Sequence, residues 1–290
     1  MSIASHVRRS RVLRFCMVII AGAVLISCGP ATKTPAGPTD PYARAKDAFK
    51  SGQFDKAADL TEKLVTANPP ADSTDRARVM RAVIFTGKLH GAKSVAEAYA
   101  KGSEKQSDYR RLKQDTLVSA AKAALSLAGT AQQIAPNGVI AKELVLDVNY
   151  PAVEGPIEVK ELATVQDGNL IEPDQQEAAF AGAYRKGVSD ALAEALCGDR
   201  AKARDTLAAG SAKLEGAAFA VFLARGLAEA AVVFDNHHGL DPAKMRAMCD
   251  AGEGALKAAQ SLLKETPNKD LEKQAKQLQD KFKALRKSAT

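Results

Sequence analysis

The sequence predicts a mostly α-helical protein, and three observations support this fold class. Apolar residues recur at the three- and four-residue spacing of a helix face through most of the chain after residue 40. Two Asp-Pro pairs, at residues 40–41 and 241–242, suit the capping residue and the first position of a helix. Tryptophan is absent and aromatic residues make up 5% of the chain, while alanine, which favours helix, is abundant. We therefore expect closely packed helices, and we do not expect an aromatic-rich sugar or peptide cleft.

The apolar periodicity divides the folded part into a series of helices. They are expected at about residues 41–52, 54–68, 75–89, from 94 onward, 108–133, 173–196, up to 210, 214–234, 242–265 and 268–287. Ser94 and Glu97 have the spacing of a capping box, which predicts a helix start at Ser94. The helix at 214–234 is apolar on all sides and is predicted to be the most buried. The last helix carries a narrow apolar stripe and is expected to cap the array.

The helical pattern lapses between residues 136 and 173, a stretch that contains four prolines. From Lys142 to Glu177 the chain has nine acidic residues and two lysines, which makes this stretch strongly negative. Residues 145–148 favour a strand, and Asp167-Gly168 between two apolar runs predicts the turn of a short β-hairpin. We interpret residues 136–173 as an acidic, irregular insertion with a β-hairpin. It serves either to select a partner or only as a soluble spacer.

The first 27 residues resemble the signal peptide of a bacterial lipoprotein. Four arginines precede an apolar run at residues 15–26, which is shorter than the roughly 20 residues that span a bilayer. Leu25-Ile26-Ser27-Cys28 resembles the lipobox of that family. The resemblance implies cleavage before Cys28, lipidation of Cys28 and a place in the cell envelope. Because Gly29 and not aspartate follows, it further implies the outer membrane, facing the periplasm. Residues 28–39, rich in proline, read as a flexible linker.

Residues 40–70 resemble a tetratricopeptide repeat, a family of stacked helical hairpins. The matching positions are Ala45, Ala48, Gly52, Phe54, Ala57 and Pro69. A partial echo follows at Gly198, Ala203 and Leu207. The resemblance implies tetratricopeptide-like helical hairpins in the N-terminal region, residues 40–135. The insertion, residues 136–173, then separates it from a C-terminal helical region, residues 174–290.

No pattern of catalytic residues, phosphate-binding loop or cofactor motif is recognisable, so the sequence does not predict an enzyme or a cofactor. Asp235, His237 and His238 stand close together, but adjacent histidines in a turn point apart, so we interpret them as a polar loop and predict no metal site. His90 is expected to pack or to face solvent. Cys197 and Cys249 remain after Cys28, and in an oxidising compartment they form either a disulfide or two buried thiols.

The net charge of the mature chain and its predicted export limit the kinds of partner that we expect. The four arginines of the signal supply four of the seven net positive charges, so the mature chain is near +3 and nucleic acid is not an expected partner. The lipid implies attachment to a membrane. We expect a helical interaction module or scaffold that binds another envelope protein. The alternative is a helical small-molecule-binding lipoprotein resembling the accessory subunit of periplasmic solute transporters.

Overall fold

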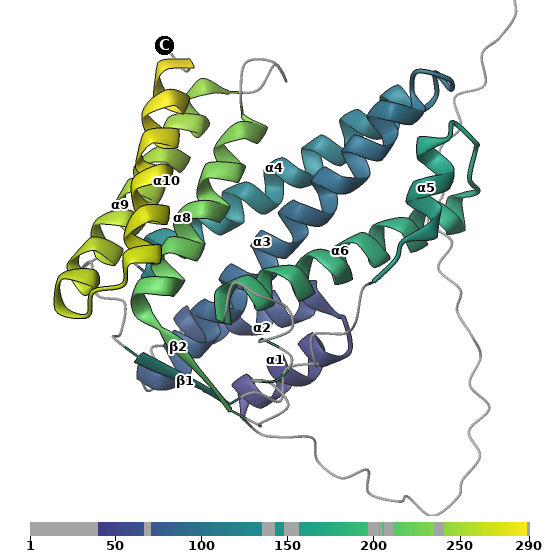
Figure 1. Cartoon of the computed structure of the whole chain (residues 1–290). Helices are drawn as coiled ribbons and strands as arrows, with labels where there is room; N and C mark the ends of the chain where they lie inside the picture. Colours follow the sequence, from purple (N-terminus) through teal and green to yellow (C-terminus); the bar gives the residue numbers. More distant parts are fainter. Residues whose placement is uncertain are drawn as a thin grey trace, which may run out of the picture. The chain divides into compact units, whose positions relative to one another are not determined.

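The structure is a computed structural model, and it describes residues 40–66, 71–134, 143–147, 157–196, 203, 205, 211–234 and 241–288. These residues are almost all helical, which confirms the predicted fold class (Figure 1). The elements are α1 (Pro41–Lys50), α2 (Phe54–Thr66), α3 (Ala71–Gly102), α4 (Tyr109–Ile134), β1 (Glu143–Asp147), α5 (Lys160–Gln166), α6 (Pro173–Leu196), β2 (Ser211–Glu215), α8 (Gly216–Val233), α9 (Pro242–Glu265) and α10 (Lys269–Ser288).

The first two helices form the predicted hairpin. Asp40 caps α1 by accepting a hydrogen bond from the backbone N–H of Tyr42 at 3.0 Å, and Pro41 occupies the first helical position. The chain turns at Gly52, whose φ of 71° is the left-handed conformation that favours glycine. Ala57 on α2 is fully buried, as a close helix contact requires. The family position Pro69 lies outside the described residues, as do Gly198 and Leu207 of the partial echo.

Helix α3 corrects the prediction of two helices and a helix start at Ser94. It runs without a break for 32 residues, and Ser94 is an exposed residue in its middle. Gly91 lies between the two predicted helices, and the helix continues through it. The glycine lets the backbone of α6 lie directly against α3 at this point. At 32 residues, α3 is nearly as long as a whole tetratricopeptide repeat of 34 residues. The short hairpin α1–α2 is therefore followed by much longer helices.

The predicted β-hairpin around Asp167-Gly168 is wrong. The residues before it form α5, and Gly168, with φ of 81°, ends this helix while its N–H donates to the carbonyl of Val165. A left-handed glycine serves a helix end as well as a hairpin turn, so the dipeptide alone does not choose between them. The strand predicted near residue 145 does form, as β1. It pairs antiparallel with β2, which begins where the sequence predicted only the approach to a helix.

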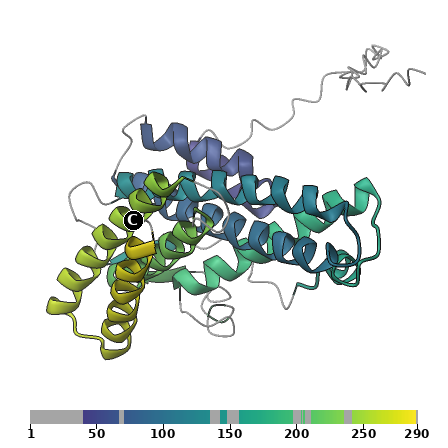
Figure 2. The ribbon, with the colours of Figure 1, turned by 90° about the horizontal axis from the view of Figure 1, so that it is seen from above.

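The helices share one main core. Helix α3 lies against α2, α4, α5 and α6, while α8 contacts α4, α9 and α10 (Figures 1 and 2). All described residues belong to one compact unit. As predicted, α8 is deeply buried, with Phe219, Phe222 and Leu227 in its interior. Among the helices of the described part, α8 alone is long and apolar enough to cross a membrane, yet most of it is covered by the protein itself. It is the core helix of this unit.

Candidate functional site

The site is built on α6, which is held against α3 by glycines. An added Cβ on Gly187 would lie 2.1 Å from the carbonyl oxygen of Gly87, and one on Gly91 would lie 2.7 Å from the carbonyl oxygen of Ala183. No side chain larger than hydrogen fits between the two backbones here. This contact fixes the position of α6 relative to α3, because the two helices cannot slide or rotate without losing it.

Next to this contact, α6 faces the turn between α1 and α2. Phe49, at the end of α1, and Phe54, at the start of α2, lie edge to face with ring centroids 5.5 Å apart. Gly52 reverses the chain between them. The hairpin therefore presents two aromatic rings next to α6. The composition of the chain did not predict such a feature, since aromatic residues are few.

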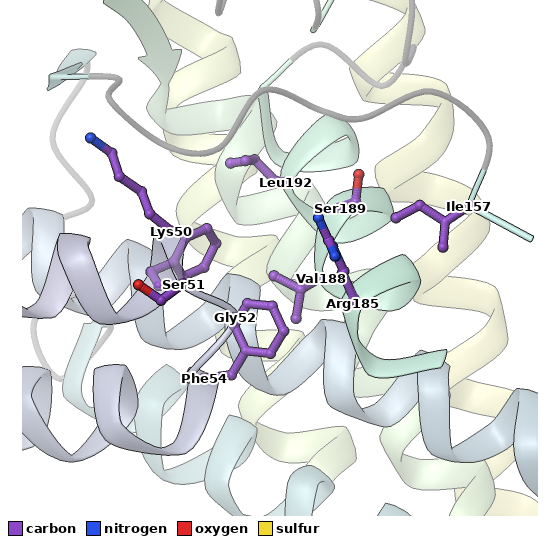
Figure 3. Close-up of a pocket in the computed structure, with 10 residues that line it drawn as sticks. Lys50, Ser51, Gly52, Phe54, Ile157, Arg185, Val188, Ser189 and Leu192 are labelled. Carbon is purple, nitrogen blue, oxygen red and sulfur yellow. The ribbon is translucent and has the colours of Figure 1, made fainter. Parts of the chain in front are cut away.

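A cleft of about 150 Å³ lies between this turn and α6 (Figure 3). Its walls come from the hairpin, from α6 and from Ile157 ahead of α5. The lining residues are Phe49, Lys50, Ser51, Gly52, Phe54, Ile157, Arg185, Val188, Ser189 and Leu192. Phe49, Val188 and Leu192 are buried, whereas Lys50, Ser51 and Arg185 are exposed. The cleft thus has an apolar floor and opens to solvent at a polar rim.

The rim of the cleft is positively charged. Lys50 and Arg185 line it, and none of its ten lining residues is acidic. Figure 3 shows Arg185 beside Ser189 on α6, whereas the side chain of Lys50, at the end of α1, points away from both of them. The hydroxyl oxygen of Ser189 is buried and has no hydrogen-bond partner among the described residues. Because buried polar groups are nearly always paired, this hydroxyl can bond to a ligand or to water in the cleft.

Two other hollows differ from the cleft in their chemistry. One, of about 440 Å³, lies between the end of α6 and the start of α10, and it is lined by acidic and basic residues together. There Arg225 is already 3.6 Å from a carboxylate oxygen of Glu194 and donates to Gln274 at 2.7 Å. The second hollow, between α9 and α10, is lined mostly by exposed polar side chains. Neither combines an apolar floor with charge of one sign.

A partly buried ionic cluster connects α3 and α8 beside the glycine contact. A carboxylate oxygen of Glu229 lies 3.0 Å from the Lys93 ammonium and 3.3 Å from Nε2 of His90. Burial alone would raise the pKa of Glu229, but the hydrogen bond and charge of His90, together with Lys93, outweigh it and lower the pKa to about 2. His90 is thus a packed residue in the middle of α3. The cluster is internally compensated, so we assign it to stability.

The residues singled out from the sequence lie elsewhere. Cys28 and Cys197 are outside the described residues, and so are Asp235, His237 and His238. Cys249 is a buried free thiol whose pKa is raised, above all by burial, which makes it unreactive. Among the described residues no cluster of three metal-ligating side chains occurs. Of the acidic residues of the insertion, Glu158 and Asp167 are exposed at the surface.

Sequence reasoning missed the cleft itself. Val188 and Leu192 are four residues apart on the apolar face of a predicted helix. Arg185 and Ser189 are also four residues apart, at the edge of that face. That spacing could have shown that a charged and a hydroxyl side chain flank the apolar face. It could not show that the α1–α2 turn stands opposite.

Comparisons with known proteins identify no relative: no protein-family model matches the chain, and no curated protein and no solved structure shows significant similarity to it.

Proposed function

We propose that this chain is a lipid-anchored protein of the bacterial cell envelope that binds a segment of a partner protein in the cleft beside α6. It would act as a helical interaction module on the periplasmic side of the membrane. The observation that carries the proposal is the cleft: an apolar floor with a positive rim, on a helix whose position is fixed by backbone contact with α3. A preformed site of this kind binds without a cost for ordering its walls.

The anchor is inferred from the sequence. The lipobox-like run ending at Cys28 is followed by a proline-rich linker up to residue 39. Two or three acyl chains on one cysteine hold a protein firmly, since each buried CH₂ contributes roughly 0.8 kcal/mol. The linker would let the folded unit, which begins with α1, reach partners near the membrane. The cleft includes the end of α1, so it lies close in sequence to the tether.

The size of the cleft favours a protein segment over a free small molecule. Sites for small molecules usually enclose about 300–1,000 Å³, whereas this cleft has about 150 Å³. An apolar cavity of roughly 150 Å³ holds one benzene-sized group. One apolar side chain of a partner fits that space, while the rest of the partner would contact the exposed rim. The small-molecule alternative remains the second candidate, and the experiments below separate the two.

Site-specific photo-crosslinking in cells tests the proposal. A photoreactive amino acid replaces Ser51, an exposed residue of the cleft rim, and in a matched strain it replaces Ser261, an exposed residue of α9. We expect a discrete protein adduct from position 51 and none from position 261. A second substitution, Ile157→Trp, should fill the cleft and abolish the adduct. Leu170→Trp is its control, because Leu170 is 62% exposed and does not line the cleft.

The outcomes of this experiment differ for the two candidates. An adduct that survives Ile157→Trp, or that forms equally at position 261, would contradict a protein partner in the cleft. If no adduct forms but Ile157→Trp displaces a small molecule that co-purifies with the protein, the small-molecule alternative is correct.

The anchor has its own test. Cys28→Ala should leave the protein as an unprocessed precursor or release it from the membrane fraction. A processed Cys28→Ala protein that stays with the membrane in high salt and carbonate would show that the anchor lies elsewhere.

A further inference from the structure

The last helix, α10, turns a row of lysines directly away from the core. It packs on α8 and α9 through its buried residues, which are Ala275, Leu278, Phe282 and Leu285. On the opposite side, exposed residues recur every three or four positions. Because an α-helix has 3.6 residues per turn, these residues fall within about a quarter of its circumference. This set, which we call the lysine row, consists of Lys269, Lys273, Lys276, Asp280, Lys283 and Lys287.

The lysine row keeps a strong positive charge. It has five lysines and one aspartate, all exposed. Asp280 lies 3.4 Å from the Lys283 ammonium, so these two charges compensate each other. Within the described part of the chain, Lys269, Lys273 and Lys276 form no ion pair with a carboxylate. The first half of the row is therefore an uncompensated positive surface.

The basic surface continues from α10 onto α9. A hollow of about 450 Å³ lies between the two helices, and it is lined by Lys264 of α9 and Lys276 of α10. Glu272 is the one acidic residue among its lining side chains. Asp270, the other acidic residue in the first turn of α10, lines a different hollow, next to the end of α6. Positive charge thus exceeds negative charge across the outer sides of both helices, at the edge of the folded unit (Figure 1).

The composition of the lysine row fits a surface of anionic lipid headgroups better than a protein. Protein interfaces are built around buried aromatic residues, methionine and arginine, and they are depleted of lysine. The lysine row contains none of these anchoring side chains, so it has no group that could fill a pocket of a partner. Lysine carries a compact charge on a flexible stem, which suits mobile phosphate groups. Without apolar side chains the row cannot insert among acyl chains, so its contact is limited to the headgroups.

We infer that the lysine row of α10 lies against the phosphate groups of an anionic membrane surface. The negative potential of such a surface attracts lysines close to it, and the attraction falls off within a screening length of about 8–10 Å. The inference uses the proposed anchor, because a tethered unit has a high effective concentration at the membrane and a weak attraction then suffices to orient it. It does not use the cleft, which none of the residues of α9 and α10 lines.

Fluorescence quenching of the full chain in vesicles tests this orientation. The chain has no tryptophan, so Gln277→Trp, at an exposed position beside the lysine row, introduces a single reporter. Protein purified from membranes is reconstituted into phosphatidylcholine vesicles, with or without phosphatidylglycerol, that contain a lipid with a nitroxide on its headgroup. We expect strong quenching with phosphatidylglycerol at low salt, and weak quenching without it or at high salt. Leu170→Trp, a reporter at a 62% exposed position before α6, should show no such difference.

Two triple variants with the same loss of charge connect the quenching to the lysine row. In the first, glutamine replaces Lys269, Lys273 and Lys276 of the row. In the control, glutamine replaces exposed lysines of α2, α3 and α4, which are Lys56, Lys101 and Lys122. Each lysine near an anionic membrane strengthens association about fivefold, so the first variant should shift the balance toward undocked α10 about a hundredfold and lose the quenching. The control should keep it, and so should arginine at the three positions of the row, because the charge is retained.

Three results would overturn the inference. They are an absence of quenching in anionic vesicles, equal quenching in neutral and anionic vesicles, and an equal loss in the control variant. An acidic protein is the alternative partner of this surface. A photoreactive amino acid at position 277 that gives a discrete protein adduct in cells, lost together with the three lysines, would overturn the lipid surface in its favour.

The proposed anchor is measured separately in the same vesicles. Through its lipid alone, the protein should sediment with neutral vesicles, whichever residues stand in the lysine row. A protein that does not sediment with neutral vesicles contradicts the anchor, and the difference between lysine and glutamine in anionic vesicles still decides the role of the row. The adduct at position 51 decides the role of the cleft independently of both.

Discussion

The stretch of α6 from residue 183 to 192 has two sides that are built in opposite ways. Toward α3 it has Gly187 and Ala183, and there the two backbones touch. Next to it, toward the α1–α2 turn, it has Arg185, Ser189 and Leu192, and a cleft of about 150 Å³ remains open. Val188 lies between the two sides, because it lines the cleft and its backbone also lies against Gly87 of α3. The same helix is thus closed on one side and unfilled on the other.

The difference shows which side of α6 tolerates no change in the distance to its neighbour. The closed side cannot accept even a methyl group at Gly187, so it sets the distance between α3 and α6. The open side keeps a buried hydroxyl that has no partner among the described residues, a feature that costs the fold stability. A rigid contact behind a preformed cleft is the arrangement expected of a binding site. If this comparison is right, changes on the two sides must differ in size and in sign.

Gly187→Ala should have the largest effect. Its new Cβ would lie 2.1 Å from the carbonyl oxygen of Gly87, and a backbone atom cannot move aside as a side chain does. We expect a loss of about 3 kcal/mol or more in the free energy of unfolding, at the upper end of overpacking effects, measured by urea denaturation.

The control is Gly129→Ala on α4. Nothing lies within 4 Å of an added Cβ there, so the change should stabilise the helix by about 0.5–1 kcal/mol. Equal stabilities of the two variants would show that α3 and α6 are not in backbone contact.

Gly252→Ala is expected to have a smaller effect and so to show the difference between a backbone and a side-chain obstacle. Its Cβ would lie 2.1 Å from Cζ of Phe282, a fully buried ring of α10. A ring can shift, so we expect a loss of about 1–3 kcal/mol. The double variant with Phe282→Leu should recover part of this loss in the same denaturation experiment. A loss as large as that of Gly187→Ala, without recovery, would contradict the distinction.

The third prediction tests whether charge, and not glycine, holds α3 in place. The pKa of Glu229 is about 2 in the folded protein and near 4.3 in an unfolded chain. The unfolded state therefore binds the proton more tightly, and this contribution to stability is lost as the pH falls from about 5 to 2. Glu229→Gln should cost about 1–2 kcal/mol at pH 7, and the gap to the unchanged protein should close near pH 2. A gap that persists at pH 2 would show that the amide disturbs α3 in another way.

Local patterns predicted the helices well wherever their ends carry local signals. The Asp-Pro pair before α9 and the glycine after α1 are examples, and the start and end of α6 were also predicted correctly. The failures at Ser94, at β2 and at the cleft share one physical cause, which is contact between residues distant in the sequence. A helix start was predicted at Ser94, but the helix continues through Gly91, which lies against the backbone of α6 almost a hundred residues later. The partner of β1 is likewise distant in sequence. The cleft joins residues near 50, 157 and 189, so no periodicity within one helix could have predicted it.

Ser189→Ala should have the smallest effect, and its sign should be opposite to that of Gly187→Ala. The hydroxyl of Ser189 is buried beside the cleft and has no partner within the described part of the chain, and keeping a polar group in that condition costs free energy. Alanine removes this cost, fits the same space and favours helix slightly more. We expect a gain of up to about 1 kcal/mol in the free energy of unfolding.

The same change separates stability from binding. If Ser189 is kept for a ligand, Ser189→Ala should also weaken the photo-crosslinked adduct at position 51, while Ser261→Ala on the exposed side of α9 should alter neither property. A site that gains stability when it loses its ligand contact is one that is maintained for binding. A Ser189→Ala protein that is less stable than the unchanged protein would show that the hydroxyl is already satisfied within the fold. The argument for an unfilled cleft would then lose its main support.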